Sequence, residues 1–378
     1  GSVVTWGYRY DGGMQEAEID GNQVSVAHLL TSGVATIAST YSAFAAVKTD
    51  GSVVTWGQSL AADSRSVAHL LTSGVATVYS TQSAFAAVKT DGSVVTWGTL
   101  SAGGDSSSVA SALTCGVVSI SSTLNAFAAV KTDGSVVAWG DYNYGGEAHS
   151  AQRCPSTCSD LDSGGVTLYS SRHSFAVVKT DGSVVSWGGH GGNSQGRCGE
   201  CWPATASTQI CAYPSPDHDS VATLLASSVA SITSAEYAMA ALKEDGSVVT
   251  WGDKRYGADS SSVASDLTSG VENITATWQA FAALKEDGSV VTWGTVYGGD
   301  SSSVVSDLSS GVVKVYSNRW AFAAVKSDGS VVTWGYAAYG GDSSSVASDL
   351  SSGVEIISST TNSFAARKAD GSIVLWGD

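Results

Sequence analysis

Short apolar runs alternate with polar turns along the whole chain, and the alternation repeats. In residues 74–98 the β-branched run Val75-Ala-Thr-Val-Tyr79 is followed by Ala84-Phe-Ala-Ala-Val-Lys89 and then by Ser93-Val-Val-Thr-Trp97. Runs of this length and composition, bounded by turn residues, are typical of β-strands. The segment therefore predicts three strands, with a short turn at 80–83 between the first and the second.

An Asp-Gly pair separates the second strand from the third. This pair between two apolar runs is a strong hairpin signal, and it predicts a type I′ turn in which both central residues have positive φ. A structural requirement of this kind explains a repeated acid without a catalytic role. The pair begins at Asp50, Asp91, Asp133, Asp181, Asp245, Asp287, Asp328 and Asp370.

The third-strand sequence, Gly-Ser-Val-Val-Thr-Trp-Gly, occurs nine times with small changes. A period of this length indicates a repeat architecture, in which each unit buries its apolar surface against its neighbours. Sheets that are apolar on both faces form a stack or a ring of sheets. The copies start at Gly1, Gly51, Gly92, Gly134, Gly182, Gly246, Gly288, Gly329 and Gly371.

Eight complete three-strand units can be assembled, and one third-strand copy is left over. The spare strand either pairs at the edge of a neighbouring unit, or the chain is a window of a longer array. An open end strand is also a template for another chain. Head-to-tail pairing that does not close would build a fibre, so self-association is one expected activity.

The order of strand, short turn and Ala-Phe-Ala-Ala-Val-Lys-x-Asp-Gly-Ser-Val-Val-Thr-Trp-Gly resembles the repeat of the regulator of chromosome condensation family. That family forms β-propellers, typically with seven blades. The spacing of 41 or 42 residues is most similar to that of the secreted β-lactamase-inhibitor propellers. The resemblance implies one all-β repeat domain over 1–378, a β-propeller or propeller-like superhelix. We expect about eight short antiparallel blades of three to four strands each. Propellers serve unrelated roles, so the resemblance says little about function.

Three units carry insertions, at 8–23, 141–165 and 188–219, and the second and third hold most of the cysteines. The spacing Cys154-x-x-x-Cys158 with Cys198-x-x-Cys201 permits a four-thiolate zinc site, but disulfides that tie two long loops are the favoured interpretation. Free thiols remain an alternative. Disulfides would place the protein outside the cell or at its surface, and the glycosylation sequon Asn273-Ile-Thr275 agrees with that location. The disulfide candidates are Cys115, Cys154, Cys158, Cys198, Cys201 and Cys211; Cys115 is either a sixth partner or a lone buried thiol.

The net charge of −16, from 34 acidic and 18 basic residues, disfavours nucleic acids and anionic membrane surfaces as partners. No nucleophile elbow, zinc-protease motif or phosphate-binding glycine loop occurs in the sequence. The cluster Asp217-His218-Asp219 is interpreted as a solvated loop, because no nucleophile is tied to it by spacing. We therefore predict no enzyme activity, no catalytic residue, no cofactor and no metal site.

The turn between the first and second strands differs in every unit, although its surroundings are nearly constant. In a propeller such turns gather on one face, and Tyr, Trp and Arg dominate binding hot spots. The resemblance to the inhibitor propellers implies that this turn corresponds to their partner-binding surface. The alternative is that unconstrained loops drift in sequence. The candidate partner-binding residues are Tyr41, Arg172, His173, Glu236, Tyr237, Trp278, Arg319 and Trp320.

Three functions follow from these patterns. The first is a non-enzymatic extracellular scaffold that binds proteins or associates with itself. The second is a protein inhibitor or receptor module that uses the variable face. The third, a nucleotide-exchange factor or chromatin adaptor, is disfavoured by the acidity and the cysteine-rich insertions.

Overall fold

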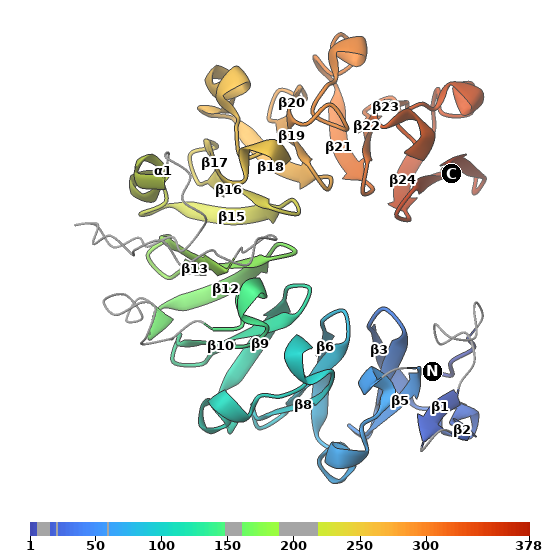
Figure 1. Ribbon diagram of the computed structural model, residues 1–378. Helices are drawn as coiled ribbons and strands as arrows, with labels where there is room; N and C mark the ends of the chain where they lie inside the picture. Colours follow the sequence, from blue (N-terminus) through green and yellow to red (C-terminus); the bar gives the residue numbers. More distant parts are fainter. Residues whose placement is uncertain (6–15, 20–21, 59, 148–160, 189–217) are drawn as a thin grey trace. The chain divides into compact units, whose positions relative to one another are not determined.

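The computed structural model describes residues 1–5, 16–19, 22–58, 60–147, 161–188 and 218–378 (Figure 1). The chain is all-β, and its framework is a series of eight three-stranded antiparallel sheets, as the repeat predicted. In sequence order the sheets are β3 (Val34–Ser39), β4 (Ala43–Lys48), β5 (Val53–Gly57); β6 (Val75–Ser80), β7 (Ala84–Lys89), β8 (Val94–Gly98); β9 (Val117–Ser122), β10 (Ala126–Lys131), β11 (Val136–Gly140); β12 (Gly165–Ser170), β13 (Ser174–Lys179), β14 (Val184–Gly188); β15 (Val229–Ser234), β16 (Ala238–Lys243), β17 (Val248–Gly252); β18 (Val271–Ala276), β19 (Ala280–Lys285), β20 (Val290–Gly294); β21 (Val312–Ser317), β22 (Ala321–Lys326), β23 (Val331–Gly335); and β24 (Val354–Ser359), β25 (Ser363–Lys368), β26 (Ile373–Gly377).

Short 3₁₀ helices follow most of the third strands and carry the Ser-rich segments. In loops that contain the sequence Gly-Asp-Ser-Ser, the aspartate accepts a hydrogen bond from the backbone N–H two residues further on, as Asp342 does from Ser344 at 2.8 Å. The 3₁₀ segments are Ala27–Leu29, Leu60–Ala62, Arg65–Leu70, Leu100–Ala102, Ser107–Leu113, Tyr142–Tyr144, Lys254–Tyr256, Ser261–Leu267, Ser302–Val304, Ala337–Tyr339 and Ser344–Val346. The one α-helix of the described residues is α1 (His218–Leu224), so the expectation of a solvated loop at 217–219 is wrong from His218 onward.

The chain divides into two compact units. The first comprises residues 1–180 and 185–212 and holds the first four sheets, apart from the first residue of β14. The second comprises residues 181–184 and 213–378 and holds the last four sheets. Whether the chain acts as one repeat domain therefore stays a prediction.

The Asp-Gly hairpins are of a different type from the one predicted. Gly92 has φ of +77°, but Asp91 keeps a negative φ, so the turn is not type I′. The Gly92 N–H donates to the Lys89 carbonyl at 2.9 Å, and the Lys89 N–H donates to the Ser93 carbonyl at 2.8 Å. This is a three-residue loop, a type I turn followed by a left-handed glycine. Asp91 contributes through its carboxylate, which accepts hydrogen bonds from the Ser93 backbone N–H and hydroxyl at 2.9 and 2.7 Å.

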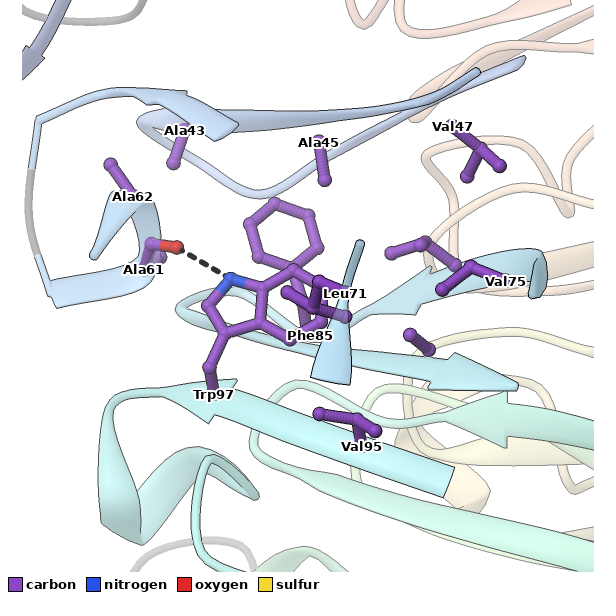
Figure 2. Packing of buried hydrophobic residues seen from close by; sticks show 12 residues of the cluster. Ala43, Ala45, Val47, Ala61, Ala62, Leu71, Val75, Phe85, Val95 and Trp97 are labelled. Carbon is purple, nitrogen blue, oxygen red and sulfur yellow. Dashed lines mark hydrogen bonds between the residues drawn. The ribbon is translucent and has the colours of Figure 1, made fainter. Parts of the chain in front are cut away.

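Each sheet buries one face against the sheet that follows it in its unit (Figure 2). Ala43, Ala45 and Val47 of β4 pack on Phe85 and Trp97 of the next sheet, and all five are buried. Small alanines on one side leave room for two stacked aromatic rings on the other, whose centroids lie 5.2 Å apart. The Trp97 Nε1–H donates to the Ala61 carbonyl at 3.1 Å, which satisfies a buried polar group across the joint.

The same bond recurs in both units and ties the third strand of most sheets to the loop of the preceding sheet. In the described residues it joins Trp139 to Gly103, Trp187 to Gly145, Trp293 to Gly257, Trp334 to Gly298 and Trp376 to Gly340, at 3.0–3.1 Å. The repeated tryptophan is therefore a structural residue of the joint.

The ninth third-strand copy occupies the place of a third strand that precedes the first sheet. The Gly1 carbonyl accepts from the Val34 N–H at 2.9 Å, and the Val3 N–H donates to the Leu30 carbonyl at 3.0 Å. At the next joint the Gly51 carbonyl and the Val53 N–H make the equivalent bonds, to the Val75 N–H and the Leu71 carbonyl. Residues 1–5 join no strand ladder, so the spare copy is held by a sheet-to-sheet joint and not at a sheet edge.

The first insertion adds a hairpin that the repeat pattern did not predict. Its strands are β1 (Glu16–Ile19) and β2 (Asn22–Ser25), and β1 pairs in parallel with β5 through Ala17 and Gly57. The first sheet therefore has five strands in the order β2-β1-β5-β4-β3. The sequence carried the signal, because Asp20-Gly21 separates two short polar–apolar runs.

No helix of the described part is long and apolar enough to cross a membrane.

Candidate functional site

The variable turns are joined to one another by backbone hydrogen bonds, so in each unit they form a continuous row. In the first unit the N–H of Tyr41 donates to the carbonyl of Gln82, Gln82 to Leu124, and Leu124 to Arg172, at 2.9–3.0 Å. In the second unit Glu236 donates to Trp278, Trp278 to Arg319, and Arg319 to Thr361, at 3.0, 2.9 and 3.4 Å. Side chains from neighbouring sheets are thereby brought side by side. We call these two rows the first and second turn rows.

The second turn row contains a compact aromatic–arginine cluster. The guanidinium carbon of Arg319 lies 4.0 Å from the ring centroid of Trp278 and 5.2 Å from that of Trp320. The two indole rings meet edge to face, with centroids 4.7 Å apart. All three side chains are half-buried, so each keeps part of its surface for a partner. A cation stacked on aromatic rings is stabilised by about 0.5–2 kcal/mol, which restricts the arginine to one orientation.

Three tyrosines extend this cluster over the neighbouring loops. Tyr339 lies 5.9 Å from Trp320, Tyr336 lies 5.0 Å from Tyr339, and Tyr297 lies 5.4 Å from Tyr336, all between ring centroids. Tyr297 and Tyr336 are exposed. These tyrosines were not among the predicted site residues. A sequence signal could have identified them. Each tyrosine follows a repeated Trp-Gly within a few residues, in a repeat whose variable turn also contains a tryptophan.

The other predicted residues are distributed over both units. Tyr41 is 77% exposed and Arg172 is exposed, both on the first turn row, whereas Tyr237 of the second unit packs on Tyr256 with ring centroids 4.5 Å apart. His173 and Glu236 have buried side chains, at 6% and 5% exposure, so the accessible surface of the rows is formed by the other residues.

His173 is a neutral packing residue. Its ring stacks on Tyr144 with centroids 4.7 Å apart. Burial, together with the smaller effect of the positive charge of Arg172, lowers the pKa of His173 to about 4. At neutral pH the imidazole therefore carries no charge.

The carboxylates of the Asp-Gly turns serve the fold. Hydrogen bonds from Ser93 lower the pKa of Asp91 below its ordinary value, and the same arrangement recurs in the other described turns of this type, as at Asp287 and Ser289. A carboxylate that is held ionised by its own turn does not fit the role of a general acid.

One of the cysteines and the glycosylation candidate lie within the described residues, and the other cysteines lie outside them. Cys115 is a free thiol and is exposed, so the expectation of a buried thiol is wrong; it lies in the turn before β9, where the neighbouring sheet does not cover it. Cys154, Cys158, Cys198, Cys201 and Cys211 lie outside the described residues. Asn273 lies on β18 and its side chain is exposed. In the described part of the chain, no group of three His, Cys, Asp or Glu residues is placed to hold a metal ion.

The fold and the turn rows define a tandem-sheet protein of the propeller type with a variable aromatic surface. No protein-family model matches the chain, and no curated protein matches it. Among solved structures it is similar to Prp20p from Saccharomyces cerevisiae, at 16% identity over 70% of this chain and 72% of that chain, with a TM-score of 0.37. It is also similar to the ectodomain of the Physcomitrella patens receptor kinase CR4, at 15% identity over 80% and 72% of the two chains, with a TM-score of 0.37. The computationally designed Ika8 protein matches at 12% identity over 92% and 96%, with a TM-score of 0.36. These distant similarities concern the fold and say nothing about a partner.

Proposed function

We propose that the protein is a non-enzymatic binding scaffold and that the second turn row contacts a protein partner. The observation that carries this proposal is the cluster of Trp278, Arg319 and Trp320 on a backbone-bonded row. These residue types are enriched in binding hot spots. These side chains already pack on one another, so they would lose little conformational entropy when a partner binds. This makes the protein an inhibitor-like or receptor-like module on a repeat scaffold.

Alanine substitution tests the proposal. A partner retained by the wild-type protein on an affinity column is identified, purified, and titrated against each variant by interferometry. We expect Trp278→Ala and Trp320→Ala each to weaken binding by about 30-fold, which corresponds to a loss of about 2 kcal/mol. Thr361→Ala, on the same row but outside the cluster, is the matched control and leaves binding unchanged. Partners that bind the tryptophan variants as tightly as the wild type would contradict the proposal.

A second proposed activity is head-to-tail self-association, and a different observation supports it. Residues Gly1 and Val3 make the bonds of a third strand that belongs to a preceding sheet. At the other end of the repeat series, Ile373 and Leu375 of β26 are 56% and 68% exposed. A second copy that packed against the exposed face of β26 would continue the series of sheets, and repeated contacts of this kind would give a fibre.

Sedimentation velocity over a range of concentrations tests this association. We expect species larger than one chain at high concentration. Thr333 occupies the position in β23 that Leu375 occupies in β26. Leu375→Thr should therefore remove exposed apolar surface without disturbing the strand, and the variant should sediment as a monomer. A wild-type protein that stays a single chain at every concentration would refute self-association.

We also propose that the protein belongs to the regulator of chromosome condensation repeat family and acts outside the cell or at its surface. Disulfides among the insertion cysteines and a glycan on Asn273 would accompany that location. The intact mass of the native protein, with and without reduction and deglycosylation, tests both modifications. A mass equal to that of the bare reduced chain would exclude them.

A further inference from the structure

Arg319 differs from Arg65, Arg255 and Arg367 in what its guanidinium contacts. Arg65 donates from Nε and Nη2 to Asp63 at 2.9 and 2.7 Å. Arg255 does the same to Asp253, at 3.1 and 2.6 Å, and Arg367 pairs with Glu355 at 3.0 Å. Arg319 has only ring contacts, to Trp278 and Trp320. Among the described residues, its guanidinium has neither a carboxylate partner nor a hydrogen-bond acceptor.

Arg255 provides an internal comparison for this arrangement. Its guanidinium carbon lies 5.8 Å from the ring centroid of Tyr256, and its N–H fork is occupied by Asp253. Arg255 therefore shows that an arginine beside an aromatic ring can bind a carboxylate through two hydrogen bonds at the same time. Arg319 has a closer aromatic contact but no carboxylate partner in the described part of the chain.

Stacking covers the faces of a guanidinium and leaves its edge of N–H donors to hydrogen-bond in the ring plane. The two indoles fix that plane, which removes part of the entropy cost of forming a bidentate pair. Partial burial also weakens solvent screening, so a hydrogen-bonded anion at this edge is held more strongly than at an open surface. The net charge of −16 repels a dianion more than a single carboxylate, which favours carboxylate over phosphate.

We propose that Arg319, held by Trp278 and Trp320, is a recognition residue for an Asp or Glu side chain of the partner. This inference rests on the proposed function of the second turn row and names the chemistry that the row selects. The partner segment places its carboxylate against the arginine fork and its neighbouring apolar atoms against the indole rings.

The probe is the capped peptide acetyl-Gly-Glu-Gly-amide, titrated to tens of millimolar while the Nε–Hε resonance of Arg319 is followed by NMR. We expect a saturable shift of this resonance and of the Trp278 and Trp320 indole N–H resonances. Acetyl-Gly-Gln-Gly-amide, which has the same shape but no charge, should give no saturable shift. Acetyl-Gly-Gly-Gly, which carries only a terminal carboxylate, shows whether a chain end is accepted instead of a side chain; a stronger response to it than to the glutamate peptide would overturn the side-chain assignment.

Variants separate this inference from a general structural effect. Arg319→Lys keeps the positive charge but loses the fork, so we expect at least a tenfold weaker response, measured on the indole resonances. Arg255→Gln is the matched control and leaves the response unchanged. Equal responses to the glutamate and glutamine peptides, or to wild type and Arg319→Lys, would overturn the inference. If the purified partner loses affinity for Trp278→Ala but not for Arg319→Gln, the proposed function stands and the carboxylate inference fails.

Discussion

The repeat offers the same substitution in two different environments, and the comparison measures what one sheet contributes to the next. Phe85 and Phe44 occupy equivalent positions in identical strands, Ala-Phe-Ala-Ala-Val-Lys, and each stacks on its tryptophan at 5.2 Å. Phe85 is fully buried by the preceding sheet, whereas Phe44 is only half-buried. Replacing Phe85 by alanine should lower the free energy of unfolding by about 4 kcal/mol, because the transfer free energy of the ring is lost and a buried cavity is left behind. Phe44→Ala should cost about 2 kcal/mol, because part of that ring is already hydrated.

Hydrogen exchange measured by mass spectrometry can resolve the two sites, since repeat proteins open in segments. We expect exchange about 10³-fold faster in β7 of Phe85→Ala and about 30-fold faster in β4 of Phe44→Ala, at one decade per 1.4 kcal/mol. Each variant serves as the control for the other, because the strand sequence and the substitution are the same. Equal acceleration in the two strands would refute the reasoning that burial by a neighbouring sheet makes the difference.

Three further predictions concern single side chains. Thr96→Val removes the 3.1 Å hydrogen bond from Thr96 Oγ1 to the Gly104 carbonyl and should lower the free energy of unfolding by about 1 kcal/mol in urea titrations; an unchanged midpoint would contradict it. The folded pKa of His173, about 4, is below its ordinary value of 6.5, so its contribution to stability is present above pH 6.5 and is lost as the pH falls toward 4. His173→Gln should therefore flatten the fall of the urea midpoint over this window, and an equally steep fall would contradict the assignment. Ser93→Ala removes the main hydrogen bond that lowers the pKa of Asp91, so the NMR titration of that carboxyl should move up toward 3.8; an unmoved titration would show another cause.

The strands were predictable because local and periodic signals agree in every unit. The predicted second strand at 84–89 matches β7, and the first and third match β6 and β8 to within one residue at each end. The hairpin type was not predictable from Asp91-Gly92 alone. A two-residue and a three-residue loop use the same pair, and the ladder bond from Lys89 to Ser93 selects the longer one. The hairpin of β1 and β2 lay outside the repeat pattern for a related reason: its pairing partner is β5, which is distant in sequence.

The strands, their order, their apolar faces and the positions of the variable turns were predictable from the sequence, because each depends on residues within one period. The sequence also singled out Trp278, Arg319 and Trp320 by residue type. The three-dimensional structure was needed to show that these three side chains touch, that His173 and Glu236 are buried, and that Arg319 has no carboxylate partner among the described residues. Those facts depend on the bonds between sheets, which join residues about one repeat apart, as the backbone bond from Trp278 to Arg319 does. A periodic sequence predicts that neighbouring sheets pack against each other. Which side chains meet depends on the three-dimensional register between those sheets.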